Sequence, residues 1–554
     1  MNTHNKFKKT LLTKSISLLL SSAVIMPTIA QESLVNDGTE VISVTGIRGS
    51  LLRAMDLKRD SEGVVDAISS EDIGKFPSTN LAESLQRIPG VSIDRVNGEG
   101  SQITVRGFGA DFNQVTLNGR TMPTANVPIV GAGSSGSASG ASGRAFDFSN
   151  LSSDGVQILE VFKTGRADIS SGGIGATVNV VTRRPLGTSG MQASISAKAI
   201  HDTSVDRGSS VTPEIGGTFS WANEENTFGI GFFGGMSNRD SAAAGATSSS
   251  WNVIPYSEFL GLTTENTIIT NAPTDLDQYV TLPRDSRYQF SEFERERANG
   301  QLVLQFAPSE QLTLTADYTF AVNKGKEEKV EFYNWFNRPF TEVVFDESPV
   351  PTTIYLKEQA INKGGGMPQV MRATKDELNS VGFNAQYHVN DTLTLTFDGH
   401  SSKAEVTPDA PMGYTEINVG LDHKYGNSPT DSAFQSVDYS GSIPVRTVET
   451  LSGETIIRPE IVASQVASGM RKVTQINEID QYDFRADWEL DDGANLTVGA
   501  NYRAQKNIAD RTDYQQILGN WGSEYPGDVE DLAPGSLETF CISCKFNDHT
   551  IGGG

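Results

Sequence analysis

Apolar and polar residues alternate along long stretches of this 554-residue chain after about residue 190. Residues 312–320 show the pattern well, since Leu312, Leu314 and Tyr318 alternate with Thr313 and Asp317. The same alternation runs through residues 301–306, 392–398, 481–490 and 495–502. A period of two places apolar side chains on one face of a strand and polar side chains on the other. The pattern therefore predicts a large antiparallel sheet with one apolar face and one polar face.

The connections between these strands alternate between short and long. Short ones lie near residues 222–226, 307–311, 389–392 and 491–495, and long ones fill residues 239–297, 323–376, 405–473 and 507 onward. Strands of about ten residues with short turns at one end and long loops at the other are typical of a transmembrane barrel. A soluble sandwich is the alternative, but loops this long are uncommon inside a compact soluble domain. We therefore expect residues 190–554 to belong to a barrel.

About nine strand candidates follow residue 190. Nine is an odd number, whereas bacterial single-chain barrels have an even number of strands. We therefore expect this part of the chain to be the incomplete N-terminal part of a barrel.

Residues 61–185 show a different, mixed pattern. Asn80 can cap a short helix with Glu83 as its reciprocal partner, and Leu81, Leu85 and Ile88 then share one helical face. Strands are predicted at 101–107, 113–118, 156–163 and 175–183. Residues 121–148 are rich in Gly, Ser and Ala and predict a long exposed loop. The segment is expected to form a compact α+β domain.

The N-terminus predicts export. Four lysines precede an apolar run from Ile16 to Met26, and a small residue, Ala30, offers a cleavage site. This arrangement is typical of a secretory signal peptide over residues 1–30. Because no other run is long and apolar enough for a spanning helix, any membrane insertion has to use strands closed into a barrel.

Charge and cysteine content exclude some functions. The net charge of −24 argues against a nucleic-acid partner, which needs a basic surface. The only cysteines, Cys541 and Cys544, could be redox-active or bind a metal, but a zinc site would want more ligands than His549 adds. In an oxidising compartment a local disulfide is favoured. No catalytic constellation stands out, so we expect neither an enzyme nor a bound metal or cofactor.

Four ordered motifs resemble those of TonB-dependent outer-membrane receptors, in particular a large proteobacterial branch. They are VISVTGIRGSL (41–51), VVDAISSEDIGKFPSTNLAESLQRIPGVSIDR (64–95), ITVRGFGADFNQVTLNGR (103–120) and ILEVFKTGRADISSGGIGATVNVVTRRP (158–185). The resemblance implies that residues 61–185 are an α+β plug inside a transmembrane antiparallel barrel of about 22 strands. It implies an outer-membrane protein whose tail and plug base face the periplasm.

The resemblance also implies a coupling segment in the periplasmic tail, residues 31–60. Residues 39–46 correspond to the TonB box, in which Glu40, Val41, Ile42, Ser43, Val44 and Thr45 would bind TonB. A short β-prone peptide can add as an edge strand to such a partner, which is energised by the inner membrane. An ordinary first plug strand is the alternative for this segment.

Arg106 and Lys163 match family residues that pair with barrel carboxylates, and generic surface charges are the alternative for both. Polar contacts between plug and barrel can be exchanged for water at small cost, which suits a plug that has to move.

An aromatic cluster is the candidate binding site for the transported solute. Phe332, Tyr333, Trp335 and Phe336 form an aromatic cluster, with Phe340 nearby, in a region predicted as a long extracellular loop. Aromatic faces would suit stacking on sugar rings or on a flat chelate. The alternatives are an anchor that folds the loop onto itself and a girdle at the lipid boundary.

By resemblance the favoured function is import of a carbohydrate into the periplasm. The alternatives are a ferric-siderophore or other metal-chelate receptor of the same architecture, and a passive porin or surface adhesin. A transcription-signalling receptor would need a further domain before the box, and only about ten residues separate Ala30 from it.

Overall fold

The structure is a computed structural model. It describes residues 58–59, 63–69, 80–96, 99–124, 144–151, 153, 155–186, 190–337, 339–360, 365–410, 413–424, 433–450, 452–455, 460–490, 494–518, 534–535 and 545. The predicted signal peptide, the TonB box with its residues Glu40 to Thr45, and Cys541 and Cys544 lie outside the described residues.

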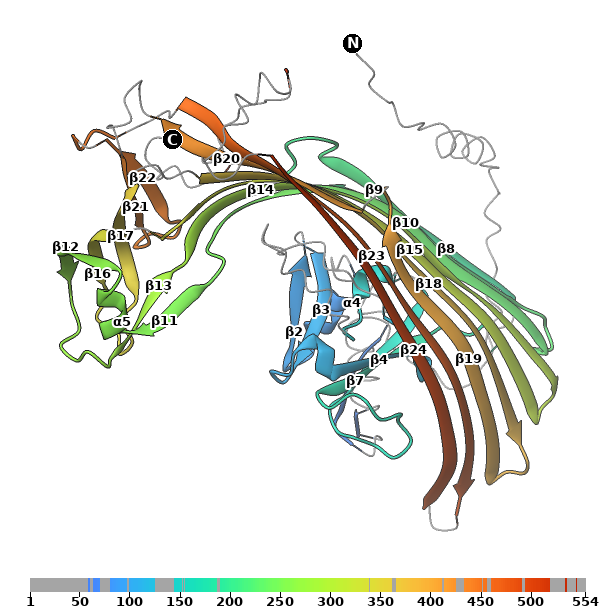
Figure 1. The fold of residues 1–554 in the computed structure, drawn as a ribbon. Coiled ribbons are helices and arrows are strands. Elements are labelled where there is room, and N and C mark those ends of the chain that lie inside the picture. The colour runs from blue at the N-terminus through green and yellow to red at the C-terminus, as the bar shows by residue number, and fades with distance from the viewer. Residues whose placement is uncertain are drawn as a thin grey trace, which may run out of the picture. The chain divides into compact units, whose positions relative to one another are not determined.

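The N-terminal domain is a small α+β unit. Its elements are β1 (Val65–Ser69), α4 (Leu81–Leu85), β2 (Val91–Val96), β3 (Glu99–Val105), η2 (Ala110–Phe112), β4 (Asn113–Leu117), β5 (Arg120–Thr121), η3 (Phe148–Asn150), β6 (Val156–Phe162) and β7 (Ala176–Thr182). Five strands form a sheet in the order β1-β6-β7-β4-β5, in which only β4 and β7 are parallel, and β2 and β3 form a separate hairpin. The predicted helix and four predicted strands are all present (Figure 1).

Helix α4 forms for the reason that the sequence predicted. The Asn80 side chain accepts a hydrogen bond of 3.1 Å from the backbone N–H of Glu83, which satisfies an otherwise unpaired donor at the helix start. The carboxylate of Glu83, the expected reciprocal partner, forms an ion pair of 2.7 Å with Arg95. Leu81, Leu85 and Ile88 are buried, so this face of the helix seals the domain core.

The second part of the chain is a long antiparallel sheet, which we call the wall. Its strands are β8 (Gly190–His201), β9 (Val211–Ala222), β10 (Phe228–Thr247), β14 (Asp285–Ser309), β15 (Leu312–Trp335), β18 (Gly365–His388), β19 (Leu393–Pro408), β20 (Tyr414–Lys424), β23 (Glu460–Glu489) and β24 (Asn495–Leu518). Both β19 and β20 pair with β18 on one side and with β23 on the other, at successive positions. They therefore lie end to end, and the ten described strands make nine antiparallel tracks, the number that the sequence predicted (Figure 1).

The two faces of the wall are inverted relative to a water-soluble protein. On β14 the polar side chains of Gln301 and Gln305 are 1% and 4% exposed, whereas the alternating Leu302 and Phe306 are 37% and 47% exposed. Exposing such apolar area to water costs about 25 cal/mol per Å². An outward apolar band with a polar interior is instead the pattern of a barrel in lipid. The predicted alternation and its membrane interpretation are therefore confirmed.

The wall strands are longer than predicted. The segment 239–297 was expected to be a loop, but β10 continues to Thr247 and β14 begins at Asp285. Likewise β15 continues to Trp335. Charged and polar residues occupy both faces of the extensions of β14 and β15, and small residues make up most of the extension of β10. The apolar alternation that marks the membrane crossing therefore ends before the strands do.

Three long excursions from the wall fold together into one unit, which we call the outer module. Its elements are β11 (Trp251–Pro255), α5 (Tyr256–Leu260), β12 (Thr263–Thr270), β13 (Tyr279–Pro283), β16 (Phe340–Phe345), β17 (Thr353–Ala360), β21 (Ala433–Asp438) and β22 (Val445–Glu449). A five-stranded sheet runs in the order β12-β16-β17-β21-β22, and β11 pairs with β13 (Figure 1). The outer module has its own core, in which Phe259, Val343, Phe345 and Leu356 are fully buried.

No helix among the described residues is long and apolar enough to cross a membrane.

Candidate functional site: the contacts between plug and wall

A two-residue turn places Arg120 at the edge of the N-terminal domain. Asn118 and Gly119 join β4 to β5 and both have positive φ angles, 54° and 85°, as a type I′ hairpin turn requires. The turn is fixed from β7: Thr182 N–H donates to Asn118 Oδ1 over 2.9 Å, and Gly119 N–H donates to Asn179 Oδ1 over 2.9 Å. The arginine that follows is therefore held on a rigid support.

Arg120 forms a buried ion cluster with two carboxylates of the wall, which we call the Arg120 cluster. Its Nη1 lies 2.6 Å from Asp317 Oδ2 on β15, and its Nε lies 2.7 Å from Asp398 Oδ1 on β19. A further bond of 3.0 Å from Nη2 to Asp398 Oδ2 makes the second contact bidentate, the geometry in which guanidinium binds most strongly. Burial opposes the charge, but the hydrogen bonds to Asp398 and the charges of Asp317 and Asp398 prevail and raise the pKa of Arg120 above its ordinary value. Arg120 therefore carries its charge at every physiological pH.

A glycine of the wall makes room for this arginine. Gly382 on β18 lies directly opposite Asp317, and a Cβ placed on Gly382 would collide with the Arg120 guanidinium. The wall therefore has a gap of one side chain at the point where the arginine enters.

Substitution of Gly382 by alanine is expected to displace Arg120 from one or both carboxylates. Loss of one charge-assisted hydrogen bond should lower the stability of the plug–wall contact by about 1.5–3 kcal/mol. The measurement is the urea midpoint at which the plug becomes accessible to protease. Gly469→Ala on β23 is the matched control, because its nearest neighbour would be 4.0 Å away. Equal midpoints for the two variants would contradict the expectation.

Wall side chains also bind the backbone that follows Arg120. Gln481 Oε1 accepts from Thr121 N–H over 3.1 Å, and His400 Nε2 lies 3.1 Å from Thr121 O. Asn477 Nδ2 donates to Thr124 O over 3.0 Å. These polar contacts extend the interface along β19 and β23.

A second ion cluster has the opposite polarity, and we call it the Glu99 cluster. Glu99, at the start of β3, is buried and forms ion pairs with three arginines of the wall. Arg239 of β10 lies 3.7 Å away, Arg297 of β14 lies 3.5 Å away, and Arg295 of β14 is in direct contact with the carboxylate. Plug and wall are thus joined by a plug cation among wall anions and by a plug anion among wall cations.

Apolar contact between the two parts is small by comparison. The main buried cluster of the described residues consists of plug side chains, and the wall adds Ala321, Leu378 and Ala404 to it. Phe233 and Phe320 of the wall also line a small cavity together with Val156 of the plug, so limited apolar contact lies beside the ion pairs.

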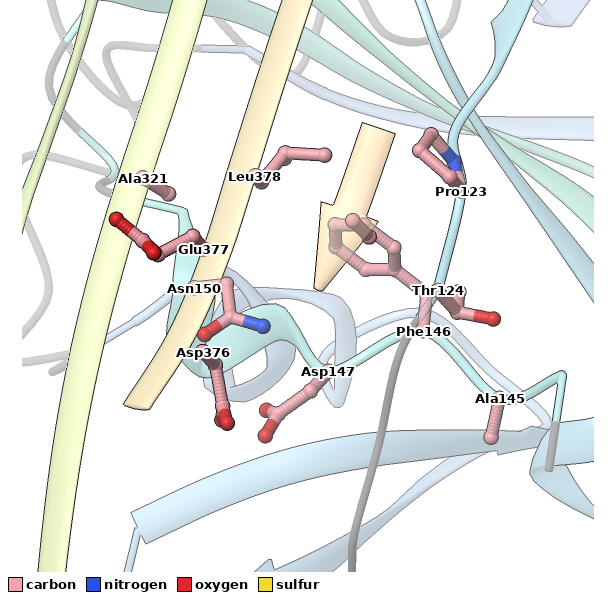
Figure 2. Close-up of a pocket in the computed structure, with 11 residues that line it drawn as sticks. Pro123, Thr124, Ala145, Phe146, Asp147, Asn150, Ala321, Asp376, Glu377 and Leu378 are labelled. Carbon is pink, nitrogen blue, oxygen red and sulfur yellow. The ribbon is translucent and has the colours of Figure 1, made fainter. Parts of the chain in front are cut away.

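A cavity of about 20 Å³ lies at this interface, room for about one water molecule. Figure 2 shows Phe146 and Asp147 of the plug beside Asp376 and Leu378 of β18, with the two aspartates extending toward the same side. The cavity is too small to hold a transported solute.

The described contacts of Arg106 and Lys163 lie within the plug and do not include the predicted barrel carboxylates. Arg106 donates to Gly175 O over 2.8 Å, and Lys163 forms an ion pair of 2.5 Å with Asp66, all within the plug. Burial works to raise the pKa of Asp66, but the bonds from Lys163 and Lys58 outweigh it and hold this pKa below its usual value. Among the described contacts, Arg120 takes the role that was assigned to these two residues.

The predicted aromatic site is not an open surface. Tyr333 is buried, and its hydroxyl accepts from Asn418 Nδ2 over 2.9 Å. Guanidinium groups lie against the other rings: Arg446 is 4.6 Å from the centroid of Phe332, and Arg284 is 4.7 Å from that of Trp335. Phe336 and Phe340 belong to the outer-module core. The described contacts therefore favour the alternative of an anchor, because Tyr333 is buried and the partly exposed Phe332, Trp335 and Phe336 each pack against an arginine or the outer-module core.

Comparison with known proteins agrees with this architecture. Residues 57–177 match the family model described as TonB-dependent Receptor Plug Domain. Among solved structures, a mutant of the ferric enterobactin receptor PfeA from Pseudomonas aeruginosa is similar at 11% identity, with 82% of this chain and 72% of that chain covered and a TM-score of 0.33. The siderophore receptor PirA from Acinetobacter baumannii is 12% identical, with 83% of this chain and 78% of that chain covered and a TM-score of 0.28. A third similar structure is a double mutant of the Serratia marcescens hemophore receptor HasR in complex with its hemophore HasA and heme. It is 12% identical, with 84% of this chain and 83% of that chain covered and a TM-score of 0.28.

A small α+β domain held by ion pairs against a wall with an apolar outer face defines a plugged outer-membrane barrel protein. Residues 57–177 match the plug domain of TonB-dependent receptors, and the long antiparallel wall that follows them supports a receptor of this plug-and-barrel type. Proteins of this family are transport receptors rather than enzymes.

Proposed function

We propose that the protein is an energy-coupled receptor that binds a scarce solute outside the cell and imports it into the periplasm. The observation that carries this proposal is the kind of contact between plug and wall. Hydrogen bonds and ion pairs can be exchanged for water as a plug shifts, whereas a large shared apolar core would resist such movement.

The proposed orientation places the short turns, the plug base and the N-terminal tail in the periplasm. Its support is the asymmetry of the connections, since β9 joins β10 through residues 223–227 whereas the outer module fills the connections at the opposite end. Short periplasmic turns and long extracellular loops are the rule for bacterial barrels. The tail with residues 39–46 would then be within reach of TonB.

The cargo that we propose is an anionic metal chelate, such as a ferric siderophore, rather than the carbohydrate favoured by the sequence. The aromatic rings proposed for sugar stacking already have partners, since Phe332 and Trp335 contact arginines and Phe336 packs against the outer-module core. The inner face of the wall instead carries Arg239, Arg295 and Arg297 together, which suits a cargo with negative charge.

Deletion of residues 39–46 is expected to abolish uptake and leave binding at the cell surface unchanged, because the plug could no longer be pulled. The measurement is accumulation of a labelled cargo in cells that contain TonB, beside binding of the same cargo to chilled cells. Deletion of residues 31–38 is the matched control, since it shortens the tail by the same length without touching the box. Uptake that survives the first deletion would favour a passive porin, and surface binding without any uptake by the unchanged protein would favour an adhesin.

A further inference from the structure

The Glu99 cluster holds more positive charge than its plug partner can neutralise. Three arginines converge on one plug carboxylate, and the wall itself adds Asp202, whose Oδ2 lies 3.2 Å from Arg239. Arg239 and Arg295 are moreover directly opposite each other on β10 and β14. Like charges at opposite positions destabilise a sheet, so this arrangement depends on the bound carboxylate.

The arginines also retain capacity to bind another acceptor. The Nε atoms of Arg239 and Arg295 are buried and have no hydrogen-bond acceptor among the described residues. Arg297 lies two positions from Arg295 on the same face of β14, so the three side chains point into one space. Guanidinium groups so placed bind planar carboxylates and similar oxyanions in bidentate fashion.

We propose that Arg239, Arg295 and Arg297 form an anion-binding site of the wall, which the Glu99 carboxylate occupies while the plug is seated. When the plug shifts, Glu99 leaves and an anionic oxygen group of the passing cargo takes its place. This exchange keeps an anion beside the three arginines in both states, which avoids the cost of leaving partly buried positive charges without a counter-ion. The role in transport rests on the proposed function, whereas the existence of the site does not.

The test is chemical rescue of Glu99→Gln in the full chain, purified in detergent. This variant removes the plug carboxylate and keeps the shape of the side chain, so the site should become free for acetate. We expect its thermal midpoint to be lower than that of the unchanged protein and to rise saturably with sodium acetate. Chloride at the same ionic strength should not reproduce the rise. In the unchanged protein, where Glu99 fills the site, acetate should have no saturable effect.

Two further variants identify the groups that bind acetate. Combining Glu99→Gln with Arg295→Gln should weaken the apparent affinity for acetate by roughly 10-fold or more, which corresponds to about 1.4 kcal/mol. Combining Glu99→Gln with Arg485→Gln should leave the apparent affinity for acetate unchanged. Arg485 belongs to the same wall, but it pairs with Asp487 rather than with the plug. Equal acetate responses in these two double variants would overturn the proposal, as would a response no greater than that of the unchanged protein.

If Glu99→Gln does not fold in acetate-free buffer, the refolding yield becomes the readout. Recovery with acetate and not with chloride supports the site, and failure with both overturns it. Neither TonB nor cargo takes part in these measurements. A failed rescue therefore counts against the anion site alone, and uptake that survives deletion of residues 39–46 counts against the proposed function alone.

Discussion

Replacing Arg120 by alanine is expected to loosen the plug more than any other single change at the interface. Asp317 and Asp398 would remain partly or fully buried with their central cation removed. Breaking a buried ion pair by removing one partner typically costs about 3–5 kcal/mol. The expected result is a large fall in the urea concentration at which protease cuts the plug, together with entry of a hydrophilic dye that the unchanged protein excludes.

Two comparisons separate this effect from a general loss of stability. Arg95→Ala removes a half-exposed ion pair with Glu83 inside the plug. It should change the free energy of unfolding by less than about 1 kcal/mol and shift the urea midpoint only slightly. A triple variant, Arg120→Met with Asp317→Asn and Asp398→Asn, removes all three charges together and should recover much of the loss. An Arg120→Ala protein as resistant as the unchanged one would show that the cluster does not hold the plug.

The second large effect is expected in the outer module. Phe259 is fully buried there, where it stacks on Phe340 at a centroid distance of 6.1 Å and meets Phe345 edge-to-face at 5.2 Å. Replacing a buried phenylalanine by alanine costs about 3–5 kcal/mol, a large share of the stability of a small folded unit. We expect Phe259→Ala to expose residues 248–284 to protease while the wall strands remain protected.

The neighbouring Leu260 provides a matched control, because its side chain is 37% exposed. Leu260→Ala should leave the cleavage pattern unchanged, since exposed positions usually contribute less than about 0.5 kcal/mol. If Phe259→Ala were cleaved no faster than Leu260→Ala, the three excursions would not share a stabilising core.

The wall and most of the plug could be predicted because their signals are local. Alternation with a period of two marks the membrane crossing, and the cap at Asn80 with its apolar face marks α4. The strand extensions beyond the membrane were missed because polar residues lie on both of their faces there. The outer module was missed for another reason: its core joins side chains as distant as Phe259 and Leu356, and no periodicity in one segment reports such contacts.

The sequence predicted that polar contacts would join the plug to the barrel, but it pointed to other plug residues than the one that makes the described contact. A polar contact between plug and barrel carboxylates was expected, yet the cation is Arg120 rather than Arg106 or Lys163. A signal for Arg120 was present, because the Asn118-Gly119 pair after a predicted strand indicates a hairpin turn that presents the next side chain. The carboxylates could not be chosen from sequence, since the wall has many inward acidic residues and only the register selects Asp317 and Asp398.

The outer module has a consequence for protein engineering. Exchange of a single surface loop between related proteins requires that the loop fold independently of its neighbours. Here β12, β16 and β21 come from three different connections and belong to one sheet. A transplant of one excursion alone would leave its partners with unpaired edges, so the three excursions have to be exchanged as a set.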